Sequence, residues 1–210
     1  MMNVTASNAA KLRRRWREAG AVERRRLIID AAMELLRQRG PSAMTMRRVA
    51  ARLGVGTMTL YTYIDGQAAL HREMTRAGFD MLHQNCQAQS TLQSAAGPNK
   101  WRGGAKAYLD FALKHPNLYK LMFDVPLNGI DEENELLHGG FQALLDRVRE
   151  QLGANGLRGA ELDRQANIAA GRFWIALHGL ATLLIAGRTG FLKLDPDQLL
   201  DDLLARVAPT

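Results

Sequence analysis

The chain has 210 residues, of which 47% are hydrophobic and 6% aromatic, and its net charge is +7 at pH 7. This length and composition exclude an intrinsically disordered chain and fit one or two globular domains with full cores. The single cysteine, Cys86, excludes an intrachain disulfide and a cysteine-rich zinc site. A reducing, cytoplasmic location fits this cysteine usage.

No segment has the composition of a membrane anchor. The N-terminus lacks the apolar core of a signal peptide, and no apolar run approaches the roughly 18 residues of a membrane span. The longest run, Phe173 to Gly187, has 15 residues and includes His178. We therefore expect a buried helix here and no membrane partner.

The positive charge is concentrated in the first third of the chain. Residues 1–70 contain 13 Lys/Arg and 5 Asp/Glu, whereas residues 71–210 contain 15 and 16. A basic module joined to a neutral one is indicated, and a basic module attracts a polyanion through counterion release. A solvated basic surface is the alternative that charge alone leaves open.

The first twenty residues are expected to form a flexible basic arm. Residues 1–10 are small and polar, and the run Lys11-Leu12-Arg13-Arg14-Arg15-Trp16-Arg17 follows them. Such a run suits contact with DNA phosphates or the minor groove. The alternative is a frayed helical lead-in to the domain that follows.

Apolar residues at helical spacing, interrupted by Gly, Pro and Asp, predict helices in the rest of the chain. Nine ranges follow in order: 22–39, 46–53, 57–63, 67–91, 105–114, 116–123, 131–152, 160–186 and 196–207. No alternating strand pattern occurs. We predict an all-α fold of about nine helices, with a three-helix helix-turn-helix domain at 21–66 and a helical regulatory and dimerisation domain at 67–210.

The segment Thr45 to Tyr63 is the most informative part of the sequence. It consists of two short predicted helices joined by a tight Leu-Gly-Val turn. The second helix carries hydroxyls and tyrosines where a surface helix would carry charge, which suits contact with base edges and phosphates. Six apolar side chains would form the core beneath it: Val49, Ala50, Leu53, Val55, Leu60 and Ile64.

From Thr45 through Leu70 the chain resembles the DNA-binding domain of the tetracycline-repressor (TetR) family of transcription regulators. The shared pattern is Thr-x-Arg-x-Val-Ala-x-x-Leu-Gly-Val, then Thr-Leu-Tyr-x-Tyr, then Ala-Leu. The chain departs from it at four positions. Gly56 replaces a capping Ser, Ile64 a common Phe, Gln67 a phosphate-binding Lys and Ala68 an acidic residue.

The resemblance implies that this segment contacts double-stranded DNA. The side chains that would approach the major groove are Thr57, Met58, Thr59 and Thr62. Arg47 would contact a base or a phosphate, and Tyr61 and Tyr63 would lie against phosphates or sugars. For the tyrosines, packing against the next helix is the alternative. The candidate residues are Thr45, Arg47, Arg48, Thr57, Met58, Thr59, Tyr61, Thr62, Tyr63 and Gln67.

The C-terminal part resembles the regulatory domain type that is named for a Trp-His-Gly motif. The resemblance covers about residues 100–207 and includes His115-Pro116 and Trp174-x-x-x-His178-Gly179. It implies an unknown small-molecule effector in a mostly apolar pocket, although ordinary core packing explains the same residues one by one. The candidates are Tyr108, Phe111, Tyr119, Met122, Phe123, Phe173, Trp174, Leu177 and His178.

Nothing in the sequence favours catalysis. Gly-x-Ser-x-Gly, Walker, His-Glu-x-x-His and dinucleotide-binding motifs are missing, so we expect no catalytic residue and no cofactor. His83 and Cys86 have a spacing that two metal ligands could use, but further ligands are lacking nearby, so no metal site is expected. The rival interpretation is an all-helical small-molecule-binding protein or enzyme whose basic N-terminus is incidental.

We therefore expect a ligand-responsive repressor that binds a palindromic operator as a homodimer. One recognition helix covers only a few base pairs, and a two-fold dimer reads two half-sites about 34–36 Å apart or a multiple of that distance. The last two predicted helices would form the interface. Small residues on the first of them permit close approach: Ala169, Ala170, Gly171, Ala176, Gly179, Ala181 and Ala186.

Overall fold

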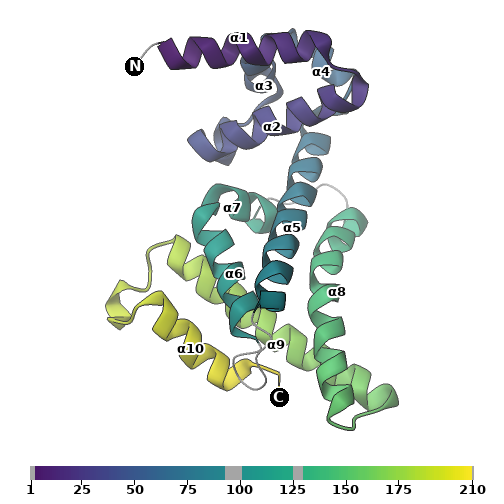
Figure 1. Cartoon of the computed structure of the whole chain (residues 1–210), viewed down its shortest axis with the longest axis vertical. Helices are drawn as coiled ribbons and strands as arrows, with labels where there is room; N and C mark the ends of the chain where they lie inside the picture. Colours follow the sequence, from purple (N-terminus) through teal and green to yellow (C-terminus); the bar gives the residue numbers. More distant parts are fainter. Residues whose placement is uncertain (1–2, 93–100, 125–129, 210) are drawn as a thin grey trace. The chain divides into compact units, whose positions relative to one another are not determined.

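The computed structural model describes residues 3–92, 101–124 and 130–209, and within them it contains ten α-helices and no strand (Figure 1). The all-α prediction is confirmed. Two short 3-10 turns, η1 (Pro41–Ala43) and η3 (Gly190–Leu192), accompany the helices. The helices are α1 (Asn3–Glu18), α2 (Ala21–Arg39), α3 (Met46–Leu53), α4 (Thr57–Tyr61), α5 (Gly66–Leu92), α6 (Arg102–Lys114), α7 (Pro116–Asp124), α8 (Ile130–Ala154), α9 (Gly159–Ile185) and α10 (Pro196–Val207).

The additional helix is α1. Where the sequence leads us to expect a flexible arm, residues 3–18 are helical, so the helical alternative describes the segment better. Most other bounds lie within a residue or two of the prediction, but α4 ends at Tyr61 rather than Tyr63. The backbone forms a turn there, because the N–H groups of Tyr63 and Ile64 both donate to the carbonyl oxygen of Leu60 at 2.9 Å.

The chain divides into two compact units. The first comprises residues 1–78 and 117–130, and the second comprises residues 79–116 and 131–210. Helix α5 contributes its beginning to the first unit and its remainder to the second. Helix α7, although distant in sequence from the helix-turn-helix segment, belongs to the first unit.

The first unit has an apolar core under α2, α3 and α4. Helix α2 buries one stripe of its surface, as its helical periodicity predicts. Helix α7 packs against the middle of α5 so closely that a Cβ on Gly78 would lie 2.6 Å from Sδ of Met122. The side chains from this unit that are at most 2% exposed are Leu27, Ile28, Ala32, Leu36, Met44, Val49, Ala50, Leu53, Leu60, Ile64, Leu70, Met74, Thr75, Tyr119 and Leu121.

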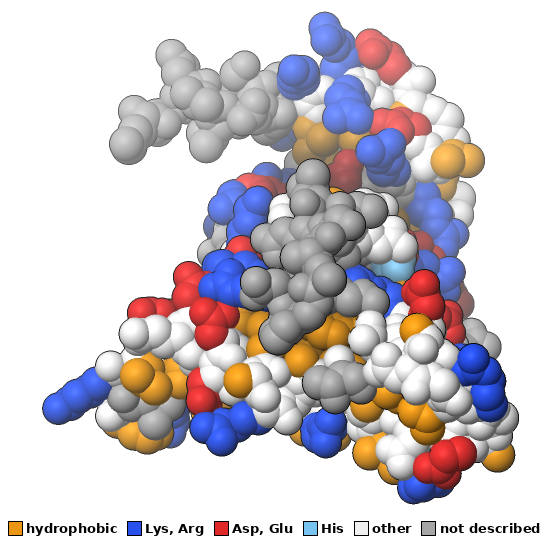
Figure 2. Space-filling model, turned by 60° about the horizontal axis from the view of Figure 1, so that its bottom comes forward, with side chains coloured by type: hydrophobic (Ala, Val, Ile, Leu, Met, Phe, Trp, Pro, Cys, Tyr) orange, Lys and Arg blue, Asp and Glu red, His pale blue; other side chains and the backbone are white. Residues whose placement is uncertain are grey.

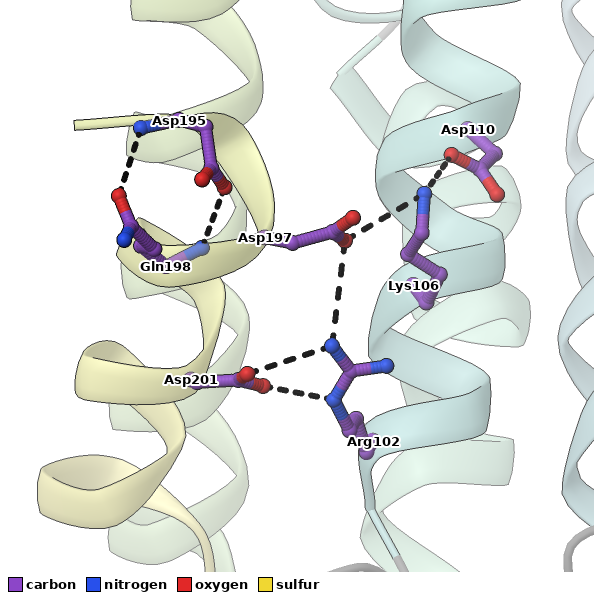
Figure 3. Close-up of polar contacts among 7 residues, drawn as sticks. All are labelled: Arg102, Lys106, Asp110, Asp195, Asp197, Gln198 and Asp201. Carbon is purple, nitrogen blue, oxygen red and sulfur yellow. Dashed lines mark hydrogen bonds and ion pairs between the residues drawn. The ribbon is translucent and has the colours of Figure 1, made fainter.

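The second unit packs α10 against α6 and α9. Polar contacts reinforce one edge of this packing, as Figure 3 shows. The guanidinium of Arg102 on α6 donates to both carboxylate oxygens of Asp201 on α10, at 2.6 and 3.3 Å. Lys106, one turn further along α6, lies 3.6 Å from Asp197 and 2.6 Å from Asp110. The bond from Arg102 lowers the pKa of the Asp201 carboxyl.

A capping box begins α10. The carboxylate of Asp195 accepts from the backbone N–H of Gln198 at 2.8 Å, and the Gln198 side chain accepts from the backbone N–H of Asp195 at 3.2 Å. The segment that follows α10 is also held, because the indole N–H of the buried Trp101 donates to the carbonyl oxygen of Pro209 at 3.0 Å. The last helix is therefore fixed at both ends within its unit.

Candidate nucleic-acid interface

The turn between α3 and α4 is built from local backbone signals. Thr45 caps α3, since its side-chain oxygen accepts from the backbone N–H of Arg48 at 3.3 Å. Gly54 ends α3 in the left-handed region at φ 72°, which glycine adopts without steric cost. The N–H of Val55 then donates to the carbonyl oxygen of Ala50 at 3.1 Å. These contacts fix the direction in which α4 leaves the turn.

Helix α4 is anchored by one side chain and exposes most of the others. Leu60 is fully buried, and Ile64 after the helix is buried as well. Met58 is 78% exposed and Tyr61 48% exposed, while Thr59 and Thr62 are exposed and Thr57 is half-buried. Of the six predicted core residues five are buried, and Val55 is half-buried.

Gly56 occupies the N-cap of α4 and supplies no side-chain hydrogen bond. Its backbone carbonyl accepts from the N–H of Thr59 at 3.0 Å. A helix of this length has little stability of its own. The exposed surface of α4 is therefore held in place by the packing of Leu60 and by its neighbours.

Tyr63 lies in a cluster that the sequence does not suggest. Its ring meets that of Trp16 edge-on, with centroids 5.6 Å apart. The guanidinium of Arg24 lies over both rings, and its Nη1 donates to the Tyr63 hydroxyl oxygen at 2.8 Å. The predicted alternative for Tyr63 was packing against α5, whereas the contacts described here come from α1 and α2. The hydroxyl retains its own proton for a further acceptor.

The remaining candidates on this surface differ in their surroundings. Arg47 and Arg48 are exposed on the first turn of α3. Arg47 has no ion-pair partner among the described side chains. Gln67, at the start of α5, donates from its side-chain amide to the carbonyl oxygen of Met44 at 3.3 Å. Gln67 therefore supplies no cation, and its amide already serves the packing between η1 and α5.

Two family models match the chain. Residues 28–74 match the bacterial regulatory proteins of the tetR family, and residues 101–207 match the tetracyclin repressor-like, C-terminal domain. The chain belongs to the TetR family. It is a DNA-binding transcriptional regulator and not an enzyme. The Trp-His-Gly subtype of the C-terminal domain stays a prediction.

Relatives of this TetR-family chain carry regulator names. An uncharacterized HTH-type transcriptional regulator of Mycobacterium tuberculosis is 28% identical over 189 residues, which cover 88% of this chain and 79% of the relative. The HTH-type transcriptional repressor DrrR1 of Streptomyces coeruleorubidus is 30% identical over 106 residues, which cover 49% of this chain and 36% of the repressor.

Solved structures share the fold. A Rhodococcus protein of unknown function matches with a TM-score of 0.71 and 22% identity, over 88% of this chain and 95% of the Rhodococcus chain. The fatty acid degradation regulator FadR of Bacillus halodurans matches with a TM-score of 0.65 and 18% identity, over 86% of this chain and 92% of the regulator.

The predicted effector residues of this TetR-family chain fall in both units. Tyr119, Met122 and Phe123 lie on α7 in the first unit. The others lie on α6 and α9 in the second unit, where Tyr108, Phe111, Phe173 and Leu177 are buried and Trp174 and His178 are half-buried. The rings of Trp174 and His178 stack at 5.6 Å, and Phe141 on α8 meets Trp174 edge-on at 6.2 Å.

Two buried polar atoms were not among the predicted candidates. Nε2 of His71 and Oγ1 of Thr75, one turn apart on α5, have no hydrogen-bond partner among the described residues. Desolvation lowers the pKa of His71. No local sequence pattern marks either residue, because the apolar surroundings that bury them come from distant parts of the chain.

Cys86 and His83 do not form a reactive or metal-binding pair in the part of the chain that the structure describes. Burial raises the pKa of the Cys86 thiol to about 12, although the charge of Arg147 opposes this. The thiol lies 3.5 Å from the carbonyl oxygen of Gly104. Within the described ranges no three His, Cys, Asp or Glu side chains are grouped as metal ligands would be.

Proposed function

We propose that this TetR-family chain is a ligand-responsive repressor that binds a two-fold symmetric operator as a homodimer, in the cytoplasm. The exposed surface of α4 above the buried Leu60 carries the proposal. Met58 and Thr59 project from a helix that is supported from beneath, and the exposed Thr62 follows at its C-cap, which suits insertion into a major groove.

The operator proposal is tested by selecting genomic fragments on the purified protein and measuring the affinity of variants for the recovered site. Thr59→Ala or Arg47→Ala is expected to weaken specific binding by about 1–3 kcal/mol where the side chain makes a good base contact. Arg188→Ala removes an exposed arginine of the second unit and serves as the control. Equal affinity for the operator in all three variants would contradict the assigned surface.

Support for a homodimer comes from one face of α9. Ile168, Ile175 and Leu183 are 51%, 65% and 48% exposed. Their spacing places them on the same side of the helix. Gly171 and Gly179 fall on this side too, and a Cβ on either would meet no atom within 4 Å. A helix can therefore approach closely here. Of the small residues that suggested an interface, Ala169, Ala170 and Ala181 are instead buried within the chain.

A homodimer interface on α9 also explains why this helix is so apolar. By length and composition α9 is the one helix in the described ranges that could cross a membrane, yet only 28% of its most apolar window is buried inside the chain. Figure 2, which turns the bottom of Figure 1 forward, shows hydrophobic side chains at the surface among charged ones. A second copy would bury the α9 face in a four-helix bundle with α10.

Analytical ultracentrifugation tests the interface. A dimer is expected at micromolar concentration, and Ile175→Glu is expected to produce a monomer because it buries a charge in the apolar face. Leu113→Glu changes a residue on α6 that is 41% exposed, and it is expected to remain dimeric. A monomeric parent chain would refute the dimer, and a dimeric Ile175→Glu variant would refute this face.

We propose that an effector controls DNA binding by changing the position of α5, a helix that contributes residues to both units. An effector bound among the aromatic residues of the second unit would change the position of α5 and weaken operator binding. A coupling free energy of roughly 1–3 kcal/mol, equal to a 5–150-fold change in affinity, is sufficient. Operator binding measured over a broad metabolite panel tests this proposal, and unchanged binding with every compound counts against it.

A further inference from the structure

We propose that α1 is a second DNA-binding element, in which Arg13 and Arg17 bind backbone phosphates beside the site that α4 reads. The proposal rests on the proposed reading of DNA by α4. It concerns a helix that precedes the segment matched by the tetR family model, which starts at residue 28. The partner is the same duplex, bound through its backbone and not through its base sequence.

Helix α1 is fastened to the helix-turn-helix segment and does not act as a free arm. Trp16 is only 7% exposed, and its ring meets that of Tyr63, two residues after the end of α4. Nε of Arg24 donates to the backbone carbonyl oxygen of Trp16 at 3.2 Å, and the same guanidinium donates to the Tyr63 hydroxyl. One arginine of α2 thus ties α1 to the residue at the end of the recognition segment.

The attachment of Trp16 determines which way each arginine of α1 points. Successive residues of a helix are rotated by about 100° about its axis. Arg15 therefore lies on one flank of Trp16, and Arg13 lies on the other flank. Arg17 lies on the same flank as Arg13, one turn further along the helix. Arg15 pairs with Glu23 of α2 at 2.6 Å, which identifies the first flank as the α2 side.

The second flank faces the turn between α3 and α4. The side chain of Arg13 lies over Gly54, where a Cβ would come within 2.5 Å of the Arg13 Nε. Glycine at this position therefore serves two purposes, since it also adopts the positive φ of the turn. Arg13 approaches the turn before α4, and Trp16 approaches Tyr63 after it. This part of α1 therefore packs against α3 and contacts residues that precede and follow the recognition helix.

Arg13 and Arg17 are available for a phosphate. Both are exposed, and neither has an ion-pair partner among the described side chains, whereas Arg15 is paired with Glu23. A guanidinium binds a phosphate through two parallel hydrogen bonds, so an exposed arginine on a helix that is itself fastened to the domain suits this contact. The start of α5 provides no such cation, because Gln67 is uncharged and bonded to Met44.

The alternative is that α1 only stabilises the domain through Trp16. The dependence of DNA affinity on salt separates the two roles. Each phosphate neutralised by a cation contributes about 0.9 to the slope of the logarithm of affinity against that of salt concentration. Arg13→Ala/Arg17→Ala is expected to lower the slope by about 1.8 per bound chain. Affinity is expected to fall for the selected operator and for a random duplex alike.

The matched control is Lys11→Ala/Arg14→Ala. It removes the same charge from the same helix, but these residues are exposed on the side away from Trp16. Its slope is expected to remain close to that of the parent chain, and Arg13→Lys/Arg17→Lys is expected to restore most of the lost slope. Equal slopes for the two alanine double variants would overturn the proposal.

A test of the attachment completes the experiment. Trp16→Ala is expected to reduce the salt slope as the arginine variant does, since α1 is no longer held beside α4, whereas Trp16→Phe retains the ring contact and the slope. The experiment distinguishes a wrong proposal for α1 from a wrong proposal for α4. If only the proposal for α1 is wrong, Thr59→Ala still weakens operator binding while the α1 variants do not. If α4 is not the reading helix, Thr59→Ala has no effect.

Discussion

The side-chain amide of Asn117, at the start of α7, donates to the backbone carbonyl oxygen of Leu36 at 3.0 Å, in the last turn of α2. A second, longer contact reaches the carbonyl oxygen of Arg37 at 3.4 Å. The Leu36 carbonyl oxygen also accepts from the backbone N–H of Gly40 at 2.9 Å, whereas the carbonyl groups that follow it at the end of a helix lack partners within the helix. A residue 81 positions away in the sequence therefore caps α2, and α7 is joined to the DNA-binding segment inside the first unit.

Asn117→Ala is expected to lower the free energy of unfolding by about 1 kcal/mol, the usual net contribution of one such hydrogen bond. Urea unfolding measures the change, and faster hydrogen exchange at the end of α2 locates it. Asn155→Ala, in an exposed turn of the second unit, is the control and should change stability by less than about 0.5 kcal/mol. Equal effects of the two substitutions would show that the Asn117 contact contributes nothing.

Glycines 54 and 56 flank the same turn and are expected to respond differently to alanine. Gly54 has φ 72°, where alanine costs about 1–2 kcal/mol. Gly56 has φ −71°, and its Cβ would meet only Thr59 Oγ1 at an ordinary 3.7 Å. Gly54→Ala is therefore expected to destabilise the domain, whereas Gly56→Ala keeps an allowed φ and is expected to cost less, through the lower preference of alanine for an N-cap.

Two further variants test the contact with Arg13 and the missing cap of α4. Gly54→Ala in an Arg13→Ala background keeps the unfavourable φ but removes the crowding side chain. We expect most of the destabilisation to persist there, because Arg13 is flexible and can move aside. Gly56→Ser should add a few tenths of a kcal/mol by capping α4. Thermal unfolding of the four proteins measures these differences, and a larger cost at Gly56 than at Gly54 would contradict the assignment of strain.

The helix-turn-helix segment could be predicted from sequence because its signals are local. Thr45 caps the helix that it precedes, and Gly54 ends that helix in the conformation that glycine favours. The apolar residues of the segment then placed Leu60 in the predicted core, where the structure buries it. Each of these inferences needs only residues within a few positions of one another.

The placement of α1 could not be predicted in this way. Its attachment depends on contacts of Trp16 with Tyr63 and with Arg24. Arg24 and Tyr63 are themselves 39 positions apart in the sequence. Before the fold is known, a basic run with one tryptophan fits a flexible arm equally well. The same limit applies to Gln67, whose bond to Met44 depends on a tertiary turn, and to the polar atoms buried on α5.

Thr75→Val is expected to raise the free energy of unfolding by about 1 kcal/mol. The Thr75 hydroxyl is buried without a partner among the described residues, in a side chain that is 1% exposed. Valine has nearly the same shape and carries no polar group to desolvate. Thr75→Ser keeps the hydroxyl but loses a buried methyl group, which costs about 0.8 kcal/mol. If chemical denaturation shows the valine variant to be less stable, the hydroxyl does have a partner.

His71 is expected to make stability fall in mild acid. Desolvation places the pKa of the folded imidazole below the value of 6.5 that an exposed histidine has. The unfolded chain therefore binds more protons as the pH falls below about 6.5, and the free energy of unfolding decreases toward the folded pKa. The contribution of His71 to the free energy of unfolding is fully present above pH 6.5 and is lost as the pH falls from 6.5 through the folded pKa.

His71→Gln is expected to flatten part of this dependence between pH 7.5 and 5.5. His115→Gln is a useful comparison, because desolvation and, to a lesser extent, the charge of Lys114 also lower the pKa of His115. Nuclear magnetic resonance titration of both imidazoles measures the values directly. A His71 pKa at or above 6.5 would remove the basis of the prediction.

Cys86 is expected to react slowly with thiol reagents in the folded chain. Burial raises the pKa of its thiol to about 12, and the thiolate is the reactive form. At pH 8 the thiolate fraction is roughly a thousandfold smaller than that of an unfolded cysteine. Ellman's reagent should therefore label the folded protein slowly and the urea-unfolded protein rapidly. Rapid labelling of the folded chain at pH 8 would mean that the thiol is exposed.

The same thiol is expected to affect the pH dependence of stability. Because the folded pKa is raised, Cys86 contributes stability that is present below pH 9 and decreases as the pH rises toward 12. Cys86→Ala should remove this decrease.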